Sequence, residues 1–75
     1  MELKKYVADF ADLFEMIDPS EITEKTVFHN LSEWDSLLAL AVMNMTSKKY
    51  GKEISLEEMR GCVTVEDLFN IIQNK

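Results

Sequence analysis

The stretch with the most chemical potential is "LSEWDSLLAL", residues 31–40, in which a serine follows an aspartate and precedes an apolar run. Three interpretations of Ser36 are open. In the first, Asp35 or Ser36 is only a helix N-cap, because both residue types accept hydrogen bonds from free N–H groups of a first turn. In the second, Ser36 is a catalytic nucleophile. In the third, it receives a phosphate-linked group, since a helix N-terminus stabilises an anion.

A catalytic serine needs a base within hydrogen-bond reach, an oxyanion hole and a pocket. The sequence offers one histidine, His29, no Gly-x-Ser-x-Gly elbow, and too little chain to enclose a substrate. We therefore expect no catalytic residues and take His29 as a surface imidazole. Cys62 is the single cysteine and is expected to be a small buried apolar residue, so no metal site is predicted.

Length and composition limit the class of protein. The 75 residues predict one domain, residues 1–75, and an apolar content of 47% indicates a folded chain. No apolar run is long enough to span a membrane and the N-terminus lacks a signal-peptide core, so we expect a cytoplasmic protein. The net charge of −6 argues against nucleic acid and anionic membranes as partners. Residues 36–52 differ from both flanking segments, because they contain three lysines and no acid.

The first half of the chain predicts one helix and one long loop. Apolar residues at steps of three and four predict a helix over residues 3–17, which ends before Asp18-Pro19 because the residue before a proline avoids the α conformation. Residues 20–34 are polar and predict a loop with one helical turn near residues 20–22. Its expected apolar anchors are Val27, Phe28 and Leu31.

The second half predicts three helices. One begins at Asp35 or Ser36 and runs to about Tyr50, where Gly51 stops it in the left-handed conformation. Capping-box patterns over residues 55–58 and 64–67 predict a short third helix ending near residue 61 and a longer last helix. No strand alternation is present. The predicted fold class is all-α, a small four-helix bundle of three longer helices and one short helix, with a long loop between the first two.

Three segments carry a resemblance to a known family. Trp34-Asp35-Ser36-Leu37 resembles the Asp-Ser-Leu attachment motif of acyl carrier proteins. "YGKEIS", residues 50–55, is similar to the stretch that closes the second helix of that family, and "VTVEDLFNII", residues 63–72, is similar to the start of its last helix. The resemblance covers nearly the whole chain.

This resemblance implies a function. Ser36 would carry a 4′-phosphopantetheine arm, making the chain a phosphoprotein, and Asp35 and Leu37 match the residues beside the attachment serine. A separate phosphopantetheinyl transferase would transfer the arm from coenzyme A. The arm would hold acyl groups as thioesters. The chain itself would not be an enzyme, because separate enzymes would act on these acyl groups. Acyl-transferring or acyl-activating enzymes of fatty acid biosynthesis, polyketide or related lipid metabolism would act on them.

The second helix departs from the family, in which acids usually follow the attachment serine. If Val42, Thr46 and Tyr50 face the core, other apolar side chains face outward. We therefore hypothesise an apolar surface for dedicated partners. The alternative is that these side chains pack beneath the long loop. The residues of this surface are Leu37, Leu38, Ala41 and Met45.

Other side chains have two interpretations each. Trp34 either packs on the core, which we favour, or covers the base of the arm. The flexible methionines either fill the core or adapt to an acyl tail. They are Met16, Met43, Met45 and Met59.

Two rival functions stay open. One is a small helical protein–protein interaction module that keeps Ser36 only as a cap. The other is a peptidyl or aminoacyl carrier, which the aspartate before Ser36 makes less favoured than an acyl carrier. Each candidate is expected to be a stable helical monomer, so fold cannot separate them, whereas covalent loading can.

Overall fold

The computed structural model describes residues 2–75, and in that part of the chain it contains helices and loops without strands. The prediction of an all-α fold with three longer helices and one short helix is confirmed. The α-helices are α1 (Leu3–Ala11), α2 (Ser36–Tyr50), α3 (Leu56–Arg60) and α4 (Val65–Gln73), and two single-turn 3-10 helices, η1 (Pro19–Glu21) and η2 (Phe28–Asn30), lie in the long loop.

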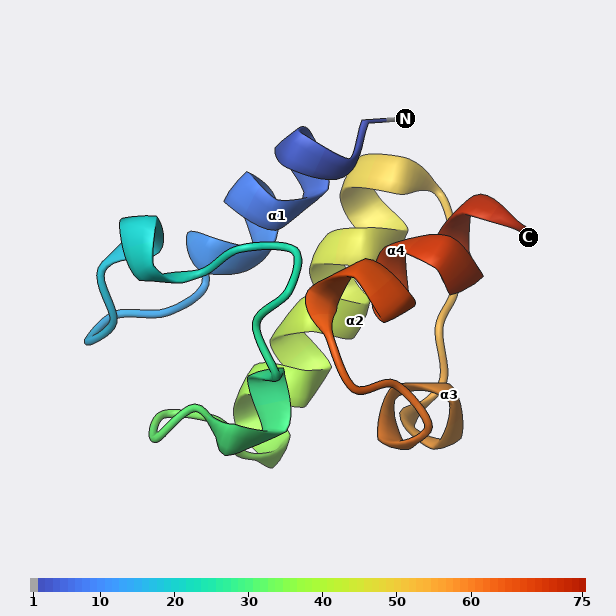
Figure 1. Cartoon of the computed structure of the whole chain (residues 1–75). Coiled ribbons are helices and arrows are strands. Elements are labelled where there is room, and N and C mark those ends of the chain that lie inside the picture. Colours follow the sequence, from blue (N-terminus) through green and yellow to red (C-terminus); the bar gives the residue numbers. More distant parts are fainter. Residues whose placement is uncertain (1) are drawn as a thin grey trace.

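Figure 1 shows α2 running through the middle of the molecule, with α4 crossing in front of it and α1 beside its C-terminal half. The helix α3 lies near the N-terminal end of α2, where η2 also lies. Both chain termini are at the opposite end of the molecule. None of the helices within residues 2–75 is both long and apolar enough to cross a membrane.

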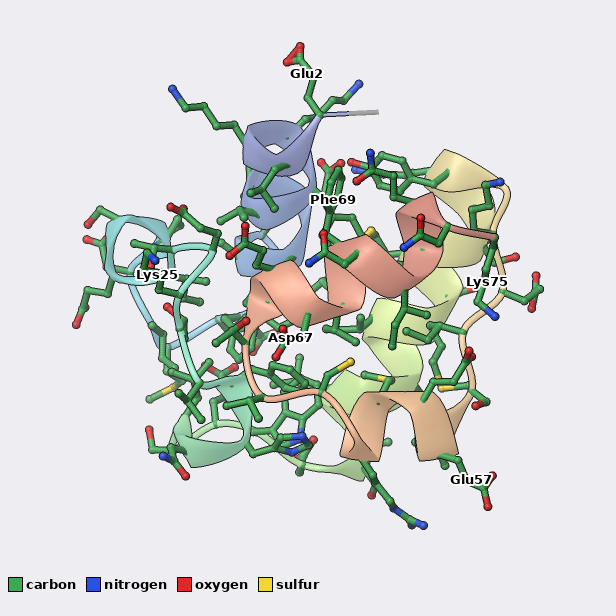
Figure 2. All side chains as sticks on the ribbon, turned by 45° about the vertical axis from the view of Figure 1, so that its right-hand side comes forward. Glu2, Lys25, Glu57, Asp67, Phe69 and Lys75 are labelled. Atoms are coloured by element: carbon green, nitrogen blue, oxygen red, sulfur yellow. The ribbon has the colours of Figure 1, made fainter. Side chains whose placement is uncertain are left out.

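The core lies where α1, α2 and α4 meet. Phe69 lies between α1 and α4, whereas Glu57 projects from α3 away from the bundle (Figure 2). The ring centroids of Phe69 and Tyr6 are 5.9 Å apart. Apolar burial of this kind is the main stabilising contribution in a small domain. The buried apolar residues are Tyr6, Val7, Phe10, Ala11, Phe14, Ile22, Phe28, Ala39, Val42, Met45, Ile54, Met59, Cys62, Val65, Leu68, Phe69 and Ile72.

The first helix is shorter than its apolar pattern predicts. The expected helix over residues 3–17 is wrong beyond Ala11, where α1 ends. The backbone N–H groups of Glu15 and Met16, which a longer helix would have used, instead donate to the Glu33 carboxylate at 2.9 and 3.0 Å. Leu13 donates to the carbonyl of Phe10 in a tighter turn. A carboxylate from the distant loop therefore ends the helix in place of local sequence.

The other helix ends follow their local signals. Gly51 adopts φ 66° after Tyr50, which confirms the predicted left-handed stop. Ser55 caps α3 and Thr64 caps α4, each within a complete capping box. Asp67, labelled in Figure 2, accepts hydrogen bonds from the two residues before α4 at 2.9 and 3.0 Å.

The long loop is anchored on the start of α4. The N–H groups of Val65 and Glu66 donate to loop carbonyls of Thr26 and Glu24 at 3.2 and 2.9 Å. These two donors belong to a first turn, where helices lack internal acceptors. Among the predicted apolar anchors Phe28 is fully buried, while Leu31 is half-buried and Val27 is 37% exposed.

Candidate functional site

The start of α2 divides two roles between neighbouring residues. Asp35 is the N-cap, because its carboxylate accepts a hydrogen bond from the N–H of Leu38 at 2.9 Å. Ser36 is the first residue of the helix and its side chain is exposed. The interpretation of Ser36 as the cap is therefore wrong, and its hydroxyl lies at the positive end of the helix dipole.

A cavity of about 280 Å³ lies beside Ser36, between the start of α2, the end of α3 and the loop around η2. Figure 1 shows these three segments converging at one end of the bundle. Most of the lining is apolar, with one carboxylate, one imidazole and one guanidinium. The lining residues are His29, Trp34, Asp35, Ser36, Ala39, Leu56, Met59 and Arg60.

Trp34 forms one wall of this cavity and also packs on the core. Its indole is stacked with Phe10 at 6.1 Å between ring centroids and meets Phe28 edge-on at 4.9 Å. Aromatic pairs at these separations add to the gain from burial. The favoured packing role is confirmed, and the same side chain borders the place where an arm on Ser36 would begin.

His29 is exposed, as predicted, but it has a structural role that the sequence did not reveal. Its Nε2 lies 3.2 Å from the Met59 carbonyl oxygen and 3.1 Å from the Cys62 carbonyl oxygen. Carbonyl oxygens only accept, so Nε2 must carry a proton and donate. His29 thus ties the loop to the end of α3. Although it lines the same cavity as Ser36, its Nε2 is not free to act as a base.

Cys62 is 3% exposed, which confirms the expected buried thiol, and burial raises its pKa. A thiol with a raised pKa is a poor nucleophile. Within residues 2–75 no group of three metal-ligating side chains is found.

The exposed face of α2 differs from the predicted one. The expectation that Met45 faces outward is wrong, because it is 6% exposed and belongs to the core. The buried stripe of α2 is wide: it also includes Ala39, Val42 and Thr46, so Met45 falls inside it. Leu38 and Ala41 are half-buried. The large apolar side chains most exposed on this helix are Leu37 at 74% and Leu40 at 54%, and Leu40 was not among the residues predicted for the apolar surface.

The methionines do not behave as one group. Met45 and Met59 fill the core, as one interpretation predicted, and Met59 also borders the cavity. Met43 is half-buried against the core. Met16 is 86% exposed, so the interpretation that it fills the core is wrong.

The fold and the site define a class of structure: a small helical domain that exposes a serine hydroxyl at a helix N-terminus. Residues 2–72 match the family described as "Phosphopantetheine attachment site". The chain belongs to this family, which is a carrier family without catalytic activity of its own, and whose prosthetic group is covalently bound 4′-phosphopantetheine.

Curated relatives fall in the same class. The chain is 34% identical over 73 residues to the meromycolate extension acyl carrier proteins of Mycobacterium leprae (strain TN) and Mycobacterium tuberculosis (strain ATCC 25618 / H37Rv). The match covers 93% of this chain and 64% of each relative, so the chain spans less than two thirds of their length. A protein of the same description from Mycolicibacterium smegmatis (strain ATCC 700084 / mc(2)155) is 33% identical, with 93% of this chain and 74% of the relative covered.

Proposed function

We propose that this chain, as one domain over residues 1–75, is an acyl carrier protein with its 4′-phosphopantetheine arm on Ser36. The observation that carries the proposal is the division of roles at the start of α2. Asp35 caps the helix, and Ser36 presents an exposed hydroxyl at its first position. A hydroxyl that caps a helix would be engaged with the backbone, whereas this one is accessible to a transferase.

The local structure suits an anionic phosphodiester. The Leu38 N–H bonds to the Asp35 carboxylate, and the Ala39 N–H bonds to the Asp35 carbonyl. Ser36 and Leu37 therefore provide the first-turn N–H groups that the helix itself does not use, and such groups stabilise a neighbouring anion. The arm supplies a terminal thiol for thioester chemistry, while this chain's residues hold its attachment point.

The partners follow from the carrier role. A phosphopantetheinyl transferase would modify Ser36, and acyl-transferring or acyl-activating enzymes would load and unload the arm. We propose that the chain acts as a cytoplasmic monomer in fatty-acid, polyketide or related lipid metabolism. The relatives serve meromycolate extension by their description, which makes a long fatty acyl group one candidate cargo. Half-buried Leu38 and Ala41 stay candidates for partner contact, beside the more exposed Leu37.

Covalent loading tests the proposal. The protein is incubated with coenzyme A, Mg²⁺ and a broad-specificity phosphopantetheinyl transferase, and its intact mass is measured. The wild type is expected to gain one phosphopantetheine group and Ser36→Ala none. Ser32→Ala, which removes another exposed serine four positions earlier, is the matched control and is expected to load like the wild type. Absence of loading in the wild type with several transferases would instead support a protein–protein interaction module, in which Asp35 rather than Ser36 caps α2.

A further inference from the structure

We propose that Arg60 is a positioning residue for the arm: its guanidinium pairs with the phosphodiester on Ser36 and draws the attached arm across the cavity between α2 and α3. The inference rests on the proposed function, because it requires the arm to be on Ser36. It adds a role for a residue outside the attachment motif.

The two residues share one cavity. Ser36 is the first residue of α2 and Arg60 is the last residue of α3, and both line the space of about 280 Å³ beside Trp34. A phosphodiester on the Ser36 hydroxyl would therefore lie at the edge of the cavity that Arg60 also lines. A long arginine side chain that is exposed can turn toward a group on that edge.

The charges of the cavity lining favour this pairing. The lining holds one carboxylate, Asp35, and one permanent cation, Arg60. A phosphodiester on Ser36 would add a second anion next to Asp35, and the Arg60 charge is the one in the lining that offsets it. The His29 Nε2, the nearby alternative donor, is already engaged with two backbone carbonyls.

Arg60 is available for such a contact. The ion pairs formed within residues 2–75 are Lys49–Asp9 and Lys75–Glu58, so Arg60 has no carboxylate partner there. A guanidinium presents paired donors in a plane, which suits the two unesterified oxygens of a phosphodiester. Because the side chain is exposed, the pair is expected to weaken as salt is added.

Trp34 provides a direct readout. It is the only tryptophan of the chain and it lines the cavity, so its emission should change when an arm lies against the lining. The backbone amides of Ala39, Leu56 and Met59 would report the same contact by NMR. Both signals are independent of acyl-transfer activity.

The experiment compares apo and loaded forms of the wild type, Arg60→Gln, Arg60→Lys and Lys48→Gln, after intact mass has verified loading of each. Lys48→Gln is the matched control, because it also removes one exposed cation but lies near the far end of α2. In the wild type we expect loading to shift Trp34 emission and the three amides, with a smaller shift at high salt. Arg60→Gln is expected to reduce the shift by about half or more, Arg60→Lys to retain part of it, and Lys48→Gln to match the wild type.

The outcomes separate the two proposals. A wild type that loads without any change at Trp34, or an Arg60→Gln protein that shows the full change, overturns the role of Arg60 and leaves the carrier function intact. A wild type that does not gain the arm overturns both. Far-UV circular dichroism of apo Arg60→Gln verifies folding, which this exposed substitution should not alter.

Discussion

The two ends of α2 differ in how their side chains are used. At the C-terminal end, the Tyr50 hydroxyl donates to the Asp9 carboxylate at 2.5 Å, and the Lys49 ammonium lies 3.3 Å from the same carboxylate. One turn earlier, the hydroxyls of Thr46 and Tyr6 are 3.0 Å apart in the core. These polar groups are satisfied inside the molecule and join α2 to α1.

At the N-terminal end, several side chains of α2 are exposed instead. Ser36, Leu37 and Leu40 are exposed, and a cavity opens beside them. This end is supported from beneath by the loop residues Phe28 and Trp34, whose rings pack together. One end of the helix therefore joins α2 to α1, while the other exposes the residues that we propose for attachment and docking. Breaking each end separately should therefore have different effects.

The largest loss of stability is expected when a ring that packs beneath the Ser36 end of α2 is removed. Phe28→Ala removes a fully buried ring that contacts Phe10 and Trp34, and should lower the free energy of unfolding by about 3–5 kcal/mol. Urea denaturation followed by circular dichroism measures the change. Val27→Ala is the control, because its side chain is 37% exposed and should contribute little. A loss for Phe28→Ala as small as that of the control would show that the loop does not support this end.

The second largest loss of stability is expected at the C-terminal end of α2. Tyr50→Phe removes the hydrogen bond to Asp9 and should lower the free energy of unfolding by about 1–2 kcal/mol, because the acceptor is charged but the pair is only partly buried. Loading at Ser36 should be unchanged. A double-mutant cycle with Asp9→Asn isolates the pair, and purely additive losses would contradict the contact.

A smaller loss is expected at the N-cap. Asp35→Ala should cost about 1 kcal/mol and speed hydrogen exchange of the Leu38 amide, which the carboxylate holds at 2.9 Å. Asp35→Ser, which keeps a capping oxygen, should retain most of the stability. Equal losses in both variants would mean that the capping bond is not what stabilises the start of α2.

The tyrosines beside the C-terminal end of α2 should make the free energy of unfolding depend on pH in the alkaline range, with no effect near neutrality. Burial raises the pKa of Tyr6 from 10.0 to about 12, and the pKa of Tyr50 is raised by burial and by its hydrogen bond to Asp9. A phenol whose folded pKa is raised contributes stability below its unfolded pKa and loses it as pH rises through the folded value. The free energy of unfolding should therefore fall from pH 10 to pH 12. Tyr6→Phe should reduce this fall, and an unchanged fall would exclude Tyr6 as a source.

Local signals predicted the parts of the fold that depend on neighbours in sequence. The start of α2, its stop at Gly51 and the caps of α3 and α4 each depend on a few adjacent residues, and each is confirmed. The attachment motif is likewise a short local pattern. These features can be predicted because the groups that hydrogen-bond to the backbone at each helix end lie within a few positions of it in sequence.

Long-range contacts explain the features that local signals did not predict. The Glu33 carboxylate binds N–H groups of residues 15 and 16, so α1 ends early although its apolar period continues. Met45 is buried because α2 is covered over a wide stripe, which a single-helix pattern does not reveal. The bond from His29 to carbonyls 30 and 33 positions away and the place of Arg60 beside Ser36 are also products of tertiary packing.

Tandem mass spectrometry of the loaded protein can show directly whether Ser36 is the attachment residue. Cleavage after Lys25 and Lys48 yields the peptide of residues 26–48, which contains three serines: Ser32, Ser36 and Ser47. Fragmentation of this peptide assigns the phosphopantetheine group to one of them. We expect the group on Ser36 alone. Its presence on Ser32 or Ser47, or outside this peptide, would show that Ser36 is not the attachment residue.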